Sequence, residues 1–155
     1  MEPFFDSNCV VCRKHRGEIS TPHGPIFENE LIFISHALPF GEEKDHYLGH
    51  VLIETRRHIP ELSELTEPEA SAIGLYTKCT AEVLMQVMGM VHVYSFVFGD
   101  GVPHVHVHVI GRYPGAPREY WGSKVDEWPQ APHGTETEIG SLNQRLREYF
   151  QAHFK

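Results

Sequence analysis

The sequence has few cysteines, no long apolar run and no excess of positive charge, and each absence excludes a class of protein. Its three cysteines cannot all pair, and 155 residues can bury a core without disulfides, which suits a reducing compartment. No stretch has the apolar length of a membrane span. The formal net charge of −8 argues against a general nucleic-acid binder, because phosphate backbones attract basic surfaces. Residues 1–6 lack the basic start and apolar run of a signal peptide, so we expect a cytoplasmic protein that binds neither membrane nor nucleic acid.

The chain also lacks internal repeats, low-complexity tracts and a linker between two cores, which predicts a single domain over residues 1–155. Within it, residues 1–25 combine a Cys-x-x-Cys motif with a loop rich in Gly and Pro. Residues 113–155 form a loop-rich C-terminal extension that ends in a predicted helix.

Short apolar and β-branched segments alternate with turn signals, which predicts strands. We expect a hairpin over 26–35 that turns at 28–30, a polar loop over 36–47, and further strands at 50–55, 91–98 and 102–110, with 91–98 buried. Short connections favour antiparallel pairing. The predicted fold class is therefore α+β, with an antiparallel sheet of about five strands, one long helix and a C-terminal helix packed on it.

Both helices carry start signals and an apolar face. Thr66-Glu67-Pro68-Glu69 matches a capping box, and Gly89 is a natural stop for the long helix. A second Thr-x-x-Glu signature at Thr135 predicts the start of the last helix. The positions expected to face the core recur at steps of three and four: Ile73, Tyr76, Thr80, Val83, Leu84 and Val87 in the first helix, and Ile139, Leu142, Leu146, Tyr149 and Phe150 in the second.

The sequence is rich in histidine, with twelve copies, and three of them alternate with valine in His104-Val105-His106-Val107-His108-Val109-Ile110. Successive side chains of a strand point to opposite faces, so the three imidazoles share one face and the valines the other. The least specific interpretation is the polar face of an exposed strand. Two chemical interpretations stand beside it: the imidazoles bind zinc, or one of them is a nucleophile.

A nucleophilic histidine fits phosphorus chemistry. Imidazole is largely neutral near pH 7, so it has a lone pair without a separate base. Its attack on phosphorus gives a reactive phosphoramidate, which divides one difficult hydrolysis into two easier steps. Neighbouring histidines can donate hydrogen bonds to the phosphoryl oxygens as charge develops.

The histidine strand resembles the signature of the histidine triad superfamily, and other segments match in the right order over about residues 9–112. Gly49-His50-Val51-Leu52-Ile53 and then Arg56-Arg57-His58-Ile59 are similar to the family's Gly-His strand and the basic turn after it. The stretch from Ile32 to Pro39 resembles its nucleoside-binding strand, and Cys9-Val10-Val11-Cys12 resembles the zinc-knuckle start of microbial members.

The resemblance implies a role for each triad residue and for His50. His106 would be the nucleophile that becomes nucleotidylated, and His108 would contact the phosphate. His104 would orient the triad or bind metal, and His50 would support the triad, the alternative being a partly exposed histidine at a strand start. A histidine at position 108 is similar to the hydrolase branches, whereas the transferase branch usually has Gln there. The family also implies a homodimer.

Cys9 and Cys12 are either a redox pair, half of a zinc site or two unligated thiols. The redox interpretation expects a thioredoxin-like βαβ setting, which this sequence lacks. By resemblance, His58 and His104 complete a structural Zn²⁺ site that fixes the N-terminal segment against the catalytic strand. Cys79 is expected to be a small buried hydrophobic residue.

The nucleotide-binding residues implied by the resemblance are Phe33, Ile34 and His36, and Arg112 is a candidate for the distal phosphates. His36 stands where better-known branches have the Asp that holds the ribose, and a histidine can also bond a sugar hydroxyl. Arg112 is alternatively a solvated loop charge. The loop over 99–103 is shorter than in many relatives and lacks their Gln, so the resemblance assigns no leaving group.

These observations predict an enzyme that hydrolyses a dinucleoside polyphosphate, a nucleoside phosphoramidate or an adenylyl-linked small molecule through a nucleotidyl-His106 intermediate. One alternative is nucleotidyl transfer to an acceptor other than water. Another is a nucleotide sensor or metal-binding module whose turnover is incidental.

Overall fold

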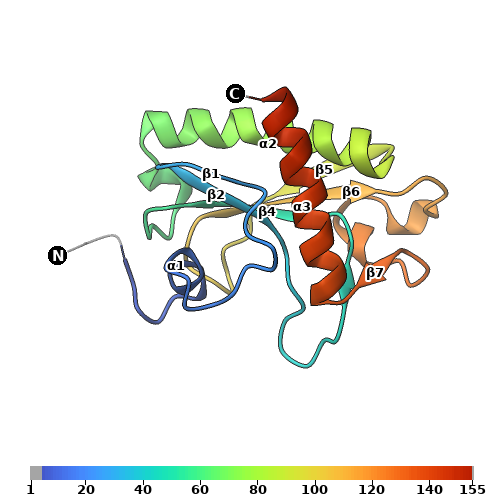
Figure 1. The fold of residues 1–155 in the computed structure, drawn as a ribbon, viewed down its shortest axis with the longest axis horizontal. Coiled ribbons are helices and arrows are strands. Elements are labelled where there is room, and N and C mark those ends of the chain that lie inside the picture. The colour runs from blue at the N-terminus through green and yellow to red at the C-terminus, as the bar shows by residue number, and fades with distance from the viewer. Residues whose placement is uncertain (1–4, 155) are drawn as a thin grey trace.

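The fold is α+β, as the sequence predicts, in a computed structural model that describes residues 5–154 (Figure 1). Five strands form one antiparallel sheet in the order β1-β2-β4-β6-β5. The strands are β1 (Phe27–Glu28), β2 (Ile32–His36), β4 (His50–Thr55), β6 (His106–Arg112) and β5 (His92–Phe96), with β3 (His46–Tyr47) and β7 (His133–Gly134) in a separate small sheet. The helices are α1 (Val10–His15), α2 (Glu67–Met88) and α3 (Glu136–His153), with 3-10 turns at Leu62–Glu64, Arg118–Tyr120 and Gly122–Glu127.

The main core lies between one face of the sheet and the two long helices, because alternate strand residues are apolar. Ile34 of β2, Ile53 of β4 and Val107 of β6 are buried there together with Val83 of α2 and Leu146 of α3. Helix α1 packs on the opposite face of the sheet, below the strands in Figure 1, whereas α2 lies above them. The alternating pattern therefore leaves the second face of β4 and β6 for polar side chains.

The signals for α2 are confirmed at both ends. The Thr66 hydroxyl accepts a hydrogen bond from the Glu69 backbone, the Glu69 carboxylate bonds the Thr66 backbone, and Gly89 ends the helix with φ of 69°. Helix α3 also begins after Thr135, but the Thr135 hydroxyl bonds the Glu138 carboxylate instead of the backbone. Among residues 5–154, no helix combines the length and apolar character needed to cross a bilayer.

Three strand predictions need correction. The segment 91–98 is not a buried strand, because β5 is an edge strand whose side chains are exposed or half-buried. Strand β6 begins at His106, not at 102. Before it, Pro103 has no N–H to donate, and the His104 N–H bonds the Val102 carbonyl locally. The predicted polar loop 36–47 ends in β3, which pairs with β7 of the C-terminal extension.

Candidate active site

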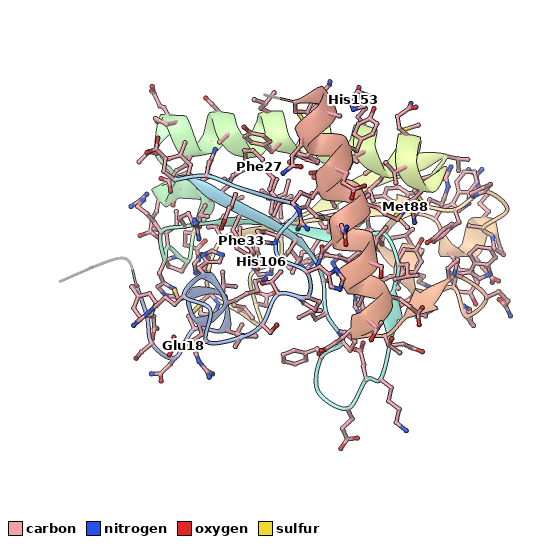
Figure 2. The ribbon with its side chains drawn as sticks, in the orientation of Figure 1. Glu18, Phe27, Phe33, Met88, His106 and His153 are labelled. Carbon is pink, nitrogen blue, oxygen red and sulfur yellow. The ribbon has the colours of Figure 1, made fainter. Side chains whose placement is uncertain are left out.

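The predicted alternation is realised for His106 and His108 of β6, but His104 does not share their face. His106, labelled in Figure 2, and His108 are half-buried on the face of the sheet opposite α2, with their ring centroids 4.9 Å apart. Val107 and Val109 are buried in the core. His104 precedes the strand and is fully buried. The three histidines therefore divide into a pair that faces a cavity and one that is enclosed.

The backbone fixes the tautomer of His106. Its Nδ1 lies 2.6 Å from the carbonyl oxygen of His104. A carbonyl oxygen only accepts hydrogen bonds, so Nδ1 holds the proton and donates it. The lone pair of a neutral His106 is consequently on Nε2, the nitrogen that a nucleophile needs.

His50 lies beside His108, where the resemblance places a supporting residue. Its Nε2 is 2.8 Å from His108 Nδ1, so the two rings share a hydrogen bond. Burial, and to a lesser extent the proximity of His106, lowers the pKa of His108 to about 4. Burial, together with the proximity of His46 and His108, lowers the pKa of His50 well below its ordinary value. Both rings are therefore neutral near pH 7.

His106 and His108 open into a cavity of about 340 Å³, a size typical of small-molecule sites. Its floor is formed by β4 and β6, and one wall is formed by α1. The polar side chains that line it are Lys14, His36, His46, His50, Glu54, His106 and His108, and the apolar ones include Val10, Val11, Ile19, Leu38, Phe40, Leu52 and Val102. The cavity thus combines an apolar compartment with a row of histidines.

A buried charge cluster under α1 was missed by the sequence analysis. The Glu54 carboxylate accepts hydrogen bonds from Lys14 Nζ at 2.7 Å and His15 Nε2 at 3.0 Å, and Glu54 is the β-ladder partner of His106. Burial alone raises the pKa of Glu54, but the charge of Lys14 and the bond with His15 outweigh it and lower that pKa to about 2. A glutamate within the apolar run of β4 was the one sequence signal for this cluster.

The structure does not bring all four predicted nucleotide-binding residues to the cavity. Ile34 is fully buried in the core on the other face of the sheet. Phe33 is on the correct face, but its ring is covered by α1 and packs against His15. Arg112, at the opposite end of β6, donates to the Tyr94 hydroxyl at 2.6 Å and stacks on Trp121 at 3.8 Å. These three side chains do not line the cavity.

His36 lines the cavity, yet both of its nitrogens are occupied by main-chain groups. Nδ1 donates to the Ala37 carbonyl at 2.6 Å, and Nε2 accepts from the backbone N–H groups of Gly49 at 2.9 Å and His50 at 3.3 Å. Burial lowers the pKa of His36 to about 4, which keeps Nε2 an acceptor. Neither ring nitrogen of His36 is therefore free for a ribose hydroxyl, and its Nε2 bonds the backbone at the start of β4.

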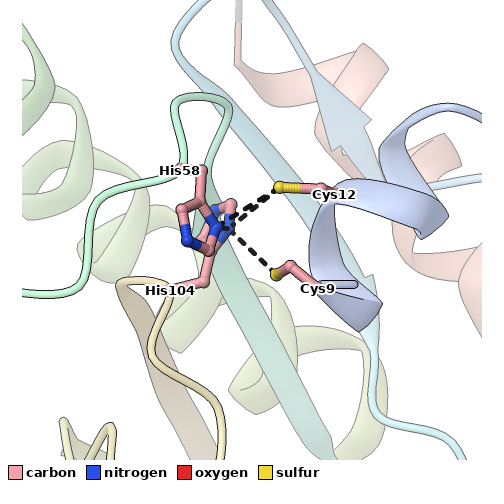
Figure 3. Close-up of side chains that lie close together, drawn as sticks. All are labelled: Cys9, Cys12, His58 and His104. Atoms are coloured by element: carbon pink, nitrogen blue, oxygen red, sulfur yellow. Dashed lines mark hydrogen bonds between the residues drawn. The ribbon is translucent and has the colours of Figure 1, made fainter. Parts of the chain in front are cut away.

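The four predicted metal ligands converge at one point beside α1 (Figure 3). His104 Nδ1 lies 3.5 Å from Cys9 Sγ, 3.6 Å from Cys12 Sγ and 3.2 Å from His58 Nδ1. Cys12 Sγ lies 3.4 Å from His58 Nδ1. A tetrahedral zinc ion with N and S ligands at its usual bond lengths separates neighbouring ligand atoms by about 3.3–3.8 Å, so the cluster has the dimensions of such a site.

The chemistry of the donor set also fits a cation. His104 Nε2 donates to the Thr55 carbonyl at 2.6 Å, which leaves the Nδ1 lone pair pointing at the cluster. Burial lowers the pKa of His104 to about 4 and raises that of Cys12 to about 11. A buried lone pair facing two buried thiols lacks a positive partner that a metal ion would supply. Cys79, as expected, is buried in the main core.

Comparison with known proteins agrees with this arrangement. The HIT domain family matches residues 26–115. An uncharacterized HIT-like protein of Methanocaldococcus jannaschii is 31% identical over 111 residues, which are 69% of this chain and 81% of that protein.

Solved structures share the fold. A Zn-bound histidine triad family protein from Mycobacterium smegmatis has a TM-score of 0.66 at 17% identity, over 94% of this chain and 96% of that one. Diadenosine triphosphate hydrolase of Plasmodium falciparum has a TM-score of 0.64 at 13% identity, over 88% of this chain and 82% of that one. With the family match over residues 26–115 and the 31% identical relative, these findings show that the chain belongs to the histidine triad family.

Proposed function

We propose that this protein hydrolyses a nucleotide phosphoanhydride or phosphoramidate bond at the α-phosphate, with His106 as the nucleophile. The observation that carries the proposal is the Nε2 lone pair of His106, left free by the bond from Nδ1 to the His104 carbonyl and facing a 340 Å³ cavity beside His108. The fold is shared with a diadenosine triphosphate hydrolase, which supports a substrate of this chemical class.

The reaction has two displacements at phosphorus. In the first, His106 Nε2 forms a bond to the α-phosphorus, the bond to the leaving group breaks, and the leaving group takes the electron pair and a proton. In the second, water attacks the phosphorus, the P–N bond breaks, and His106 is regenerated as the nucleotide departs. His108, whose Nε2 is not used by His50, is placed to exchange a proton or a hydrogen bond with the reacting groups.

Substrate binding follows from the two halves of the cavity. The apolar side chains of Val10, Leu38 and Leu52 suit a planar base, and the histidines suit the phosphates. With His36 fully occupied, we assign no side chain to the ribose.

We also propose that Cys9, Cys12, His58 and His104 hold a zinc ion. All four positions are filled by protein ligands, so the ion supplies cross-linking of α1 to the sheet and no open coordination site for substrate. This assignment is supported by the ligand distances and by the Zn-bound relative of the same fold.

The test is a panel of dinucleoside polyphosphates and nucleoside phosphoramidates, measured for turnover and, by intact mass after an alkaline quench, for a nucleotidyl adduct. We expect His106→Ala to lose turnover and the adduct while still binding nucleotide, and His92→Gln, an exposed histidine on β5, to behave like the parent protein. Transfer of the nucleotide to an acceptor other than water would favour the transferase alternative. Nucleotide binding without turnover or adduct across the panel would favour the sensor.

A further inference from the structure

A chain of hydrogen bonds leads from the active site to the protein surface through His46, a residue that lies outside the motifs found in the sequence. His108 Nδ1 is 2.8 Å from His50 Nε2, and His50 Nδ1 is 2.8 Å from His46 Nε2. His46 Nδ1 is 3.2 Å from Glu43 Oε2, and the Glu43 side chain is 53% exposed. His46 and His50 therefore use both ring nitrogens in this series of hydrogen bonds, whereas His108 uses Nδ1 and keeps Nε2 for the cavity.

The C-terminal extension holds His46 in this position. His46 is paired with Gly134 of β7, and the Leu48 N–H donates to the Pro132 carbonyl at 3.0 Å. A Cβ added at Gly134 would lie 2.8 Å from Leu48 Cδ2 and 2.9 Å from the Glu138 carboxylate, so these two side chains pack closely against the β7 backbone. The pairing of β3 with β7 links a catalytic-site segment to residues far away in sequence.

The donors and acceptors of the chain can reverse together. When the Glu43 carboxylate accepts from His46 Nδ1–H, His46 Nε2 accepts from His50 Nδ1–H, and His50 Nε2 accepts from His108 Nδ1–H. His108 Nε2 then has a free lone pair. When one proton is added at His108 Nε2, the Nδ1 proton of His108 moves to His50 Nε2, and the Nδ1 proton of His50 moves to His46 Nε2. His46 then carries the positive charge, next to the Glu43 carboxylate.

We infer that His46 and Glu43 are positioning residues in a proton relay: during turnover a proton passes between His108 and His46 through His50, and the Glu43 carboxylate at the protein surface stabilises the charge on His46. The inference rests on the proposed function. In the first displacement, His108 Nε2–H gives its proton to the leaving group, each ring passes one proton inward, and His46 becomes neutral. In the second, His108 Nε2 takes a proton from the attacking water, each ring passes one outward, and His46 regains its charge. After both displacements, His46, His50 and His108 have returned to their starting protonation states.

The surroundings of the chain fit this role. Burial keeps His50 and His108 neutral, so these two rings can pass protons without holding a charge themselves. The groups facing His46 are Glu43, Lys44 and Asp45 of its own loop, His36 of β2, His50 of β4, Asp126 of the 3-10 turn and His133 of β7. Those facing His108 are His50, His106 and Glu54, with Phe98 at its edge.

The test compares His46→Gln and Glu43→Gln with His92→Gln, a control at an exposed histidine of β5 that lies outside this series of hydrogen bonds. The glutamine amide can still form hydrogen bonds. It lacks the imidazole ring, which can accept a proton at one nitrogen and release one from the other. We expect His46→Gln to lower kcat by about tenfold or more with little change in KM, since proton transfer typically contributes at least this much. The solvent isotope effect should show several protons in flight in the parent and fewer in His46→Gln, and the control should match the parent.

Rescue and spectroscopy separate a relay from a merely structural role. Imidazoles added to His46→Ala should restore kcat in proportion to their basicity, and the nucleotidyl-His106 adduct should still form. If His46→Gln kept the pH profile, the isotope effect and the kcat of the parent, the relay would be overturned. The assignment of His106 as the nucleophile would not be affected. If no substrate turns over, nitrogen NMR of the parent and His46→Gln decides: unchanged His50 and His108 tautomers in the variant would overturn the inference.

Discussion

At the scale of single residues, main-chain carbonyls decide what each histidine can do. His104, His106 and His36 each donate one ring N–H to a carbonyl oxygen at 2.6 Å. His104 uses Nε2 and leaves Nδ1 for the cysteines, whereas His106 uses Nδ1 and leaves Nε2 for the cavity. His36 also uses Nδ1, but its Nε2 is occupied by backbone N–H groups. One kind of hydrogen bond thus leaves free the ring nitrogens that the proposed metal site and the proposed nucleophile need, whereas in His36 both nitrogens are occupied.

The burial of His36 makes the stability of the protein depend on pH. The unfolded chain binds a proton at this residue below pH 6.5, whereas the folded state excludes it until about pH 4. The resulting contribution is fully present above pH 6.5 and is lost as the pH falls toward 4, by up to about 1.4 kcal/mol per pH unit. Urea unfolding at several pH values measures how steeply the free energy of unfolding depends on pH. This slope should be smaller in His36→Gln by the contribution of one titrating group. The exposed His92→Gln should keep the full slope, and equal slopes in all three proteins would contradict this account.

Glu54 should matter for stability far more than an exposed glutamate in a similar pair. Glu54→Gln removes the charge that compensates the half-buried Lys14 ammonium, and leaving such a charge unpaired costs about 3–5 kcal/mol. The matched control is Glu28→Gln, which breaks the more exposed pair with Arg56 and should cost less than about 1 kcal/mol. Chemical denaturation measures both, and a similar loss in the two variants would refute a special role for the buried cluster.

At the scale of elements, α1 is the piece that most depends on its surroundings. A helix of six residues has no stability of its own. It is held by the Lys14–Glu54 ion pair and by the contacts of its cysteines with His58 and His104, and it supplies Val10 and Val11 to the cavity wall. The cluster of the proposed metal site and the cavity therefore share one element.

Loss of the cluster should weaken both folding and substrate binding. We expect the parent to hold one zinc ion per chain, and Cys9→Ser to lose it, lower Tm and raise KM more than it lowers kcat. Cys79→Ser, a buried cysteine of α2 outside the cluster, should retain zinc and KM. Metal analysis and steady-state kinetics measure these quantities. Full zinc content in Cys9→Ser would remove the cysteines from the proposed site.

At the scale of the whole molecule, apolar side chains are exposed along the β5 edge of the sheet and on α2. Val97 and Phe98, which follow β5, are 41% and 62% exposed, and Leu75 and Met85 of α2 are 56% and 44% exposed. An edge strand with exposed apolar residues invites pairing. We propose that a second copy of the chain covers this surface.

The proposed dimer predicts a change in mass when the edge is charged. Phe98→Glu combined with Val97→Lys should shift the protein toward the monomer in sedimentation velocity, because charges desolvated in an interface oppose association. Leu62→Lys, an exposed apolar position on a 3-10 turn, should leave the association state unchanged. A parent protein that sediments as a monomer at high concentration would rule the dimer out.

The sequence by itself determined the features that depend on neighbours along the chain. Alternation along β6 placed His106 and His108 on one face, and local capping signals defined both ends of α2. The grouping of Cys9, Cys12, His58 and His104 followed from the family resemblance, because local periodicity carries no information on which distant residues meet.

Only the tertiary structure decided the pairings between distant segments: Lys14 with Glu54, His46 with His50, and β3 with β7. It also showed β5 to be an exposed edge, which β-branched and aromatic composition alone does not reveal. The physical reason is that a hydrogen bond or ion pair between remote residues depends on where the folded backbone brings them. Local side-chain patterns specify the element and its faces, whereas partners across the molecule follow from packing.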